Sequence, residues 1–173
     1  MLTYKIARLW GSPQGTVEKY DIDEKLVYPD DPELDFSTNF SAKLQLIRLK
    51  EEISAIISDA GVGLHFTCPL CLKKFVKNLE ISSMEGEFFY DNTTVRPHEA
   101  DIFLINKKAI TIDLSDLVRQ EIILHFPLVP LCSRGCKGLC AHCGGNKNKT
   151  ICKCKNENTQ THKPFKNLKK LLS

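Results

Sequence analysis

The chain has 173 residues, of which 42% are hydrophobic and 26% charged. These proportions are typical of a soluble globular domain and exclude a disordered or collagen-like chain. No apolar run approaches the roughly 18–20 residues that a membrane-spanning helix needs, so no membrane partner is expected.

The formal net charge of +3 hides an asymmetry along the chain. Residues 134–173 hold ten Lys or Arg and one acid, a charge of +9, whereas residues 1–133 hold 14 basic and 20 acidic side chains, a charge of −6. A basic block of this kind indicates an anionic partner. The alternative is a solubilising surface, or a segment that docks onto the chain's own acidic part.

The amino terminus lacks the apolar core and small-residue cleavage site of a secretory signal. We therefore expect a cytoplasmic protein, in a reducing compartment where disulfides are rare. The eight cysteines are an even number, which would also suit disulfides. In a reducing compartment, short spacings between thiols favour a zinc site instead.

The amino-terminal residues 1–40 are expected to form an irregular arm. The stretch "YPDDPELDF" within it has two prolines and four acids, which is typical of a loop. From residue 42 the pattern changes, and "AKLQLIRL", "EISAIIS" and "GVGLHFTC" predict two or three antiparallel strands. The tripeptide "DAG" at 59–61 is expected to be the turn between the last two runs.

The next part of the chain predicts further strands and then one helix. "VKNLEISSMEGEFFY" is extended, residues 91–101 form a polar loop, and "IFLIN" and "AITID" predict a hairpin around Asn106. Apolar residues then recur at helical spacing over residues 113–126, with Asp113 as the N-cap and Pro127 after the last turn.

We thus predict an α+β fold in two main parts. The first is an antiparallel β-rich body over residues 41–130 that includes the helix 113–126. The second is a cysteine-rich, basic, zinc-binding tail over residues 131–173. It is too poor in large apolar residues to form its own core, so metal must order it. "KPFKNLKKLL" near its end predicts a short amphipathic helix.

Eight thiols are enough for two four-sulfur sites, so one or two structural Zn²⁺ ions are expected. A four-thiolate site leaves no coordination position for substrate and is structural. In one partition the "CPLC" pair meets the first two tail cysteines and the last four form a local site; in the other, the first four tail cysteines share one site. The predicted ligands are Cys68, Cys71, Cys132, Cys136, Cys140, Cys143, Cys152 and Cys154.

No catalytic constellation is present in the sequence, so we expect neither an enzyme nor a small-molecule substrate. There is no Gly-rich phosphate loop, no G-x-S-x-G elbow and no H-E-x-x-H. The tail, in contrast, alternates lysines with asparagines in "GGNKNKTICKCK", which is suited to phosphate and ribose contacts. The predicted RNA-binding residues are Lys137, Lys147, Lys149, Lys153 and Lys155.

Several of these stretches together resemble a known family. "DLSDLVRQEIILHFPLVPLC" followed by "CKGLCAHCGGNKN" and a C-x-C pair is similar to the YceD family of large ribosomal RNA subunit accumulation proteins. "CPLCLKKF" is similar to its upstream cysteine motif and "KPFKNLKKLL" to its C-terminal helix. The resemblance covers residues 67–172, with Ala141 standing where proline is common.

The resemblance implies a bacterial or organellar protein without catalytic activity. It would be needed for accumulation of the large-subunit ribosomal RNA and for assembly of the large subunit. Ribosomal RNA and a zinc-ribbon ribosomal protein of the large subunit are the implied partners. An alternative function is a protein-binding adaptor, whose acidic body receives a basic ribosomal protein without direct RNA contact.

Overall fold

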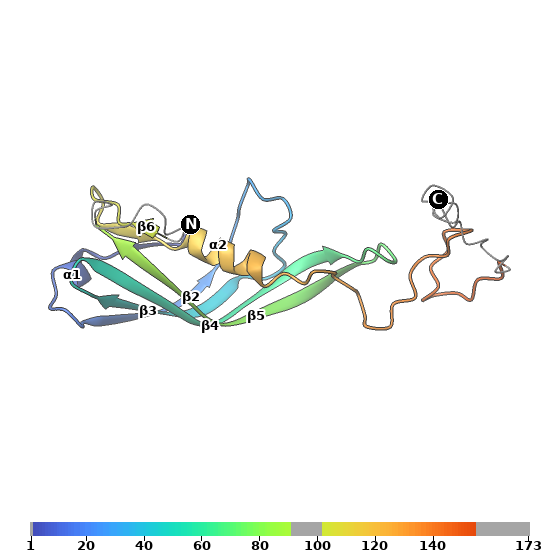
Figure 1. The fold of residues 1–173 in the computed structure, drawn as a ribbon, viewed down its shortest axis with the longest axis horizontal. Coiled ribbons are helices and arrows are strands. Elements are labelled where there is room, and N and C mark those ends of the chain that lie inside the picture. Colours follow the sequence, from blue (N-terminus) through green and yellow to red (C-terminus); the bar gives the residue numbers. More distant parts are fainter. Residues whose placement is uncertain (1, 91–101, 155–173) are drawn as a thin grey trace, which may run out of the picture.

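The computed structural model describes residues 2–90 and 102–154 (Figure 1). Strands dominate it, and the elements in chain order are β1 (Thr3–Lys5), α1 (Ala7–Trp10), β2 (Val17–Glu24), β3 (Phe40–Arg48), β4 (Glu52–Thr67), β5 (Lys74–Phe89), β6 (Ile102–Leu104), β7 (Thr111–Asp113) and α2 (Ser115–Leu124). Neither helix in these ranges is long and apolar enough to cross a membrane. The predicted α+β class with a β-rich body is confirmed. The predicted C-terminal helix lies outside the described residues.

The main sheet has five strands in the order β2-β3-β4-β5-β6, and all neighbours are antiparallel except β5 and β6. β1 and β7 form a separate antiparallel pair. β4 and β5 have 16 residues each, so they make a hairpin that runs the length of the body (Figure 1). The turn of this hairpin lies at the end of the body nearest the tail.

The core forms on the face of the sheet that α2 covers (Figure 1). In β3, Phe40, Leu44 and Leu46 are fully buried and alternate with more exposed residues, as expected for a strand with one face in the core. α2 approaches β5 at Gly86, where a Cβ would lie 2.8 Å from Leu117 Cδ2. Glycine at this position therefore permits close packing of the helix on the sheet.

The prediction of an irregular arm over residues 1–40 is wrong in part, because residues 3–24 contain β1, α1 and β2. β2 pairs with β3 over eight consecutive positions. Leu2, Ile6 and Leu9 are buried in the core. β1 and α1 are too short to show a clear period in the sequence, and β1 and β2 are stabilised by pairing with strands that come later in the chain.

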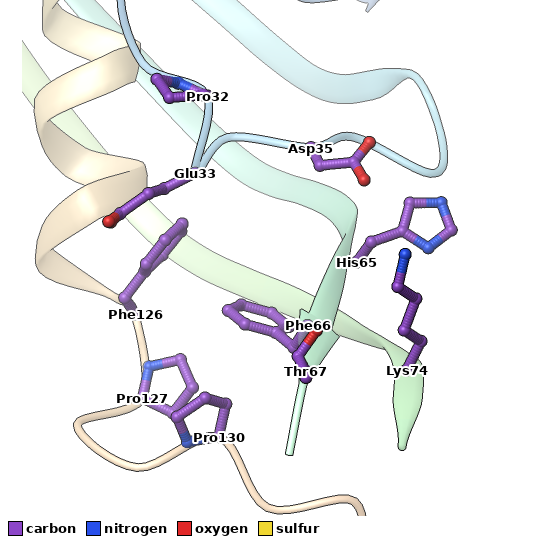
Figure 2. A pocket seen from close by; sticks show the side chains of 10 residues that line it. All are labelled: Pro32, Glu33, Asp35, His65, Phe66, Thr67, Lys74, Phe126, Pro127 and Pro130. Carbon is purple, nitrogen blue, oxygen red and sulfur yellow. The ribbon is translucent and has the colours of Figure 1, made fainter. Parts of the chain in front are cut away.

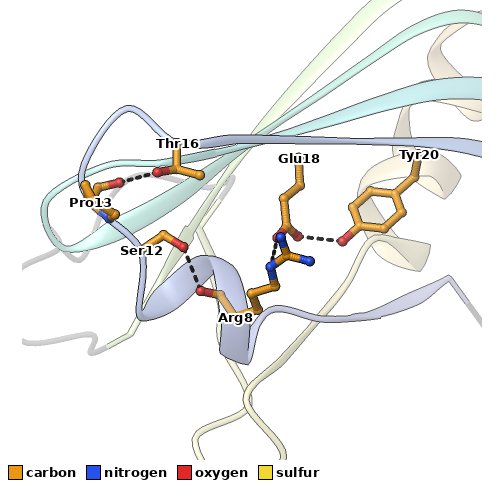
Figure 3. A network of polar contacts seen from close by, with 6 residues as sticks. All are labelled: Arg8, Ser12, Pro13, Thr16, Glu18 and Tyr20. Atoms are coloured by element: carbon orange, nitrogen blue, oxygen red, sulfur yellow. Dashed lines mark hydrogen bonds and ion pairs between the residues drawn. The ribbon is translucent and has the colours of Figure 1, made fainter.

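Polar side chains of α1 and of β2, which is an edge strand, meet at the surface (Figure 3). The Tyr20 hydroxyl donates to Glu18 Oε2 at 2.6 Å, and Arg8 Nε lies 3.8 Å from Glu18 Oε1. The hydrogen bond to Glu18 and partial burial raise the pKa of Tyr20 to about 12. The phenol therefore stays a donor at physiological pH.

The "DAG" tripeptide is a β-bulge, and the turn expected there is wrong. β4 runs unbroken through it, and between the paired positions Ser41–Gly61 and Lys43–Ser58 two residues of β4, Asp59 and Ala60, oppose one residue of β3, Ala42. Asp59 has a φ of 52°, and its carboxylate accepts a 2.8 Å hydrogen bond from Lys43 Nζ. A bulge bends a strand without ending it. Because a bulge and a turn use the same residue types, the sequence pattern does not distinguish them.

The hairpin expected around Asn106 is also incorrect in its strand pairing. β6 pairs with β5 and β7 pairs with β1, so a single bridge between Asn106 and Thr111 remains of the hairpin. The following helix begins after Leu114, which occupies the N-cap position expected for Asp113. Asp113 still contributes, because its Oδ1 accepts from the Ser115 N–H at 2.9 Å.

Candidate metal centre

The first pair of predicted ligands lies in the turn that joins β4 to β5. The Cys68 N–H donates to the Lys73 carbonyl at 2.9 Å, and the Leu72 N–H donates to the Cys68 carbonyl at 2.8 Å. Leu72 adopts a positive φ of 58°, which closes the turn. Cys68 and Cys71 are both buried, so this part of the body presents two thiols inward from a fixed loop.

The tail supplies two more thiols to the same place. Cys68 Sγ lies 3.8 Å from Cys136 Sγ, and Cys71 Sγ lies 3.5 Å from Cys132 Sγ. All four sulfurs lie within 4.8 Å of one another. We call this group cluster 1.

The tail is fixed against the turn by backbone contacts beside cluster 1. The Leu139 N–H donates to the Leu70 carbonyl at 2.9 Å. Gly138 has a φ of 68°, and a Cβ on it would lie 3.0 Å from the same carbonyl oxygen. This position therefore needs glycine both for its backbone conformation and for the close approach of the two segments.

A second group of thiols forms within the tail itself, from Cys140, Cys143, Cys152 and Cys154, and we call it cluster 2. Cys152 Sγ lies 3.4 Å from both Cys140 Sγ and Cys143 Sγ. The Gly144 N–H donates to the Cys140 carbonyl at 2.9 Å, and Gly144 has the positive φ, 67°, expected after a C-x-x-C turn. Cluster 2 is more exposed than cluster 1.

The two clusters correspond to the first of the two partitions considered from the sequence. Cys132 and Cys136 lie with the body pair, and the last four cysteines form the local group. Because a Zn–S bond is about 2.3 Å, the sulfurs of a tetrahedral site lie about 3.8 Å apart. The closest sulfur pairs, at 3.4–3.8 Å, fit this geometry, and all eight cysteines are free thiols.

The electrostatics of each cluster also suit a cation. Burial raises the pKa of Cys68, but hydrogen bonds from the backbone amides of Cys132, Cys71 and Leu70 outweigh it and lower that pKa to about 6. Hydrogen bonding to Cys71 and burial raise the pKa of Cys132 to about 12.

Cluster 2 shows the same division. Backbone amides lower the pKa of Cys140 to about 6, and hydrogen bonding to Cys152 raises the pKa of Cys154 to about 12. In each cluster one thiol is thus favoured to ionise, and its negative charge opposes ionisation of the neighbouring thiols. A divalent ion would remove that resistance.

Asn148 connects the two clusters, a role that the sequence analysis missed. Its Nδ2 donates to Cys136 Sγ of cluster 1 at 3.4 Å, and its Oδ1 accepts from the Lys137 N–H at 2.8 Å. Asn148 itself lies in the loop between Cys143 and Cys152 of cluster 2. Its side chain was expected to contact RNA, whereas these bonds commit it to the tail's own structure. The paired asparagines of "NKN" are a turn signal, and the Asn148 N–H does donate to Asn146 Oδ1 at 2.9 Å, but this signal does not point to Cys136.

The predicted RNA-binding lysines lie on the surface of the same tail. Lys137, Lys147, Lys149 and Lys153 are exposed, and none forms an ion pair within the described ranges. Lys155 lies outside those ranges. Arg134, which the prediction left out, is exposed in the loop between Cys132 and Cys136.

Comparison with known families bears on what this arrangement is for. The family model described as "Large ribosomal RNA subunit accumulation protein YceD" matches residues 60–172, which include both clusters. The chain belongs to the YceD family. The resemblance noted in the sequence is thereby confirmed, and the family's description indicates a role in accumulation of the large ribosomal RNA.

Two plant members of the YceD family are similar to the chain over short segments. Both are named "Large ribosomal RNA subunit accumulation protein YCED homolog 1, chloroplastic". The one from Zea mays is 45% identical over 56 residues, 32% of this chain and 19% of its own length. The one from Arabidopsis thaliana is 36% identical over 59 residues, 34% of this chain and 18% of its own. The chain thus matches less than one fifth of either relative. No solved structure matches it.

Proposed function

We propose that the chain is a non-enzymatic cytoplasmic factor that supports accumulation of large-subunit ribosomal RNA and assembly of the large subunit. It binds ribosomal RNA through the tail, which zinc orders. The observation that carries the proposal is the position of exposed lysines on loops whose ends are fixed by the two thiol clusters. The printed names of the family and of its plant members support the connection to ribosomal RNA.

Zinc would supply structure rather than chemistry in this function. Bound by four thiolates, it holds the loop ends together and has no open position for a substrate. Cys132 and Cys136 attach the tail to the body, and Asn148 bridges the two clusters. Lysines on loops fixed in this way lose little conformational entropy when they meet phosphate.

The lysine contacts are expected to be ionic and independent of base sequence. Each phosphate that a lysine neutralises releases counterions, so the logarithm of affinity falls with the logarithm of salt by about 0.7–0.9 per contact. The four described lysines therefore predict a slope of up to about −3 to −4. Residues 131–154 contain no Phe, Tyr or Trp for stacking on bases, and His142 is the one aromatic ring in this range.

The test is charge reversal in the full-length protein. We change Lys137, Lys147, Lys149 and Lys153 to Glu and measure binding to a large-subunit ribosomal RNA fragment between 50 and 300 mM KCl. We expect affinity to fall by more than tenfold and the salt slope to flatten, with two zinc ions retained by elemental analysis. Unchanged affinity at full zinc content would show that the tail does not bind the RNA.

A matched control separates a local effect from a change in net charge. Four exposed lysines of the body carry the same substitutions in a second variant, namely Lys19, Lys50, Lys77 and Lys108. We expect this variant to keep most of its RNA affinity. An equal loss in both variants would mean that only total charge matters.

The second candidate function is the protein adaptor, and the acidic body favours it, with −6 over residues 1–133. In that case a basic protein of the large subunit, such as a zinc-ribbon ribosomal protein, would bind the body while the tail only packs. Co-purification with such a protein after nuclease treatment supports this function. Loss of all ribosomal proteins on nuclease treatment would favour RNA as the direct partner.

A further inference from the structure

A groove of about 790 Å³ lies where the body meets the tail (Figure 2). Its apolar wall consists of Phe66 from the end of β4, Phe126 just after the C-cap of α2, and the rigid ring of Pro127. The two phenylalanine rings meet edge to face, with centroids 5.4 Å apart. The groove thus combines aromatic surface with a wall whose backbone is restricted by proline.

The end of β4 offers an open strand edge to this groove. The Cys68 N–H donates toward β5, to the Lys73 carbonyl, and successive residues of a strand direct their N–H groups to opposite edges. The Thr67 N–H therefore points to the other edge, where the His65 N–H donates to the Asp35 carbonyl at 2.8 Å. On that edge the described ranges provide no donor for the His65 carbonyl and no acceptor for the Thr67 N–H.

The chain itself shows how this edge is used. The loop residue Phe36 forms an antiparallel bridge with Leu64, and the Ser37 N–H donates to the Gly63 carbonyl at 2.8 Å. On the N-terminal side of Asp35 the loop turns away from β4, where the Leu34 N–H donates to the Asp31 carbonyl within the loop itself. The strand-like pairing therefore stops at His65, with the His65 carbonyl and the Thr67 N–H still open on this edge.

The charged groups around the groove are mainly acidic. Glu33 and Asp35 line it from the loop, both are exposed, and neither forms an ion pair within the described ranges. Lys74 lies on the opposite wall beside His65 (Figure 2). Two carboxylates and one ammonium group thus line the groove, in a body that is acidic as a whole.

We propose that this groove binds an extended peptide of a partner protein in which a basic residue stands next to an apolar one. The peptide backbone pairs with His65 and Thr67 as an added strand, a mode in which main-chain hydrogen bonds provide affinity and side-chain contacts provide selectivity. Its apolar side chain packs on Phe66 and Phe126. Its basic side chain pairs with Glu33 and Asp35, which would repel the phosphates of a nucleic acid.

The site is separate from the tail lysines, so the two proposals stand or fall independently. The probe is a fluorescein-labelled peptide of alternating arginine and valine, Gly-Arg-Val-Arg-Val-Arg-Val-Gly, added to the full-length, zinc-loaded protein. Fluorescence anisotropy gives its affinity, and amide exchange followed by NMR reports on the Thr67 N–H. We expect binding together with at least tenfold slower exchange at Thr67.

Variants of the acidic wall test the charge selectivity. Glu33→Gln with Asp35→Asn removes two exposed charges, each of which pairs weakly, so we expect roughly fivefold weaker binding of the peptide. Glu80→Gln with Glu85→Gln removes two exposed carboxylates elsewhere on β5 and is expected to leave affinity within twofold. The same peptide with glutamate for arginine is expected to bind at least tenfold more weakly.

Other outcomes would overturn the proposal. Equal binding of the arginine and glutamate peptides, or no change in Thr67 exchange, would exclude the site as described. A single-stranded RNA 12-mer that displaces the peptide from the Lys137, Lys147, Lys149 and Lys153 charge-reversal variant would assign the groove to nucleic acid. If Lys163→Glu with Lys166→Glu raises peptide affinity more than fivefold, the occupant is the chain's own C-terminal segment.

Discussion

Gly138 provides the sharpest test of how the tail is attached to the body. Its φ of 68° costs an alanine roughly 1–2 kcal/mol. A Cβ there would also lie 3.0 Å from the Leu70 backbone oxygen, and relieving such a contact costs a further 1–3 kcal/mol or so. Gly138→Ala should therefore destabilise the attachment by about 2–5 kcal/mol.

Metal affinity at cluster 1 reports this loss, because ordering of the tail and binding of metal are coupled. Since 1.4 kcal/mol is a factor of ten, 2–5 kcal/mol predicts about 30- to 4000-fold weaker binding at this cluster. Competition with a chromophoric chelator measures the two affinities. Separate ¹¹³Cd NMR resonances assign each affinity to a cluster.

Substitutions at two other glycines of the tail distinguish the cost of a positive φ from the cost of the contact with Leu70. Gly144 has a φ of 67° but open space around it, so Gly144→Ala should weaken cluster 2 by only about 5- to 30-fold. Gly135 has neither constraint, and Gly135→Ala should change both affinities by less than twofold. If Gly138→Ala weakened cluster 1 no more than Gly144→Ala weakens cluster 2, the contact with Leu70 would have no energetic role.

Three further predictions concern the metal, the bridge between clusters and one ion pair. Chelation should abolish amide-exchange protection in residues 131–154 while the five-stranded sheet keeps its far-UV circular dichroism; a tail that stays protected without metal would contradict zinc ordering. Asn148→Ala removes the 3.4 Å bond to Cys136 Sγ and should weaken cluster 1 about tenfold in the same chelator assay, whereas an effect on cluster 2 alone would contradict the bridging role. The hydrogen bond from Arg119 lowers the pKa of Asp31, so this pair stabilises the fold at neutral pH and loses its effect as pH falls through the folded-state pKa. Urea unfolding should then separate wild type from Arg119→Gln most at neutral pH and least in acid, and a constant separation would refute the linkage.

The cysteine pattern predicted the candidate metal centre better than the strand pattern predicted the sheet. Cysteines at short spacing can be divided between two metal sites in only a few ways. The choice between the two partitions considered depended on whether Cys68 and Cys132 lie together in space. That meeting is set by backbone contacts such as Leu139 with Leu70, which have no sequence signal. Asn148 was assigned to RNA for the same reason, because its partner Cys136 is 12 positions away.

The errors in the fold have a common physical cause. Leu2, Ile6 and Leu9 are buried by strands that come much later in the chain, so their local pattern carries little information. The bulge at Asp59 uses turn residues inside a strand. In contrast, α2 has a strong period over ten residues and lies within the predicted range 113–126.

Cluster 1 has a consequence for how the protein is made. Its thiols come from two stretches of chain, and 61 positions separate Cys71 from Cys132. At about 5–20 residues per second, translation needs about 3–12 s to produce the second pair after the first. A metal ion held by all four thiolates of cluster 1 could therefore bind only after Cys132 and Cys136 have been made.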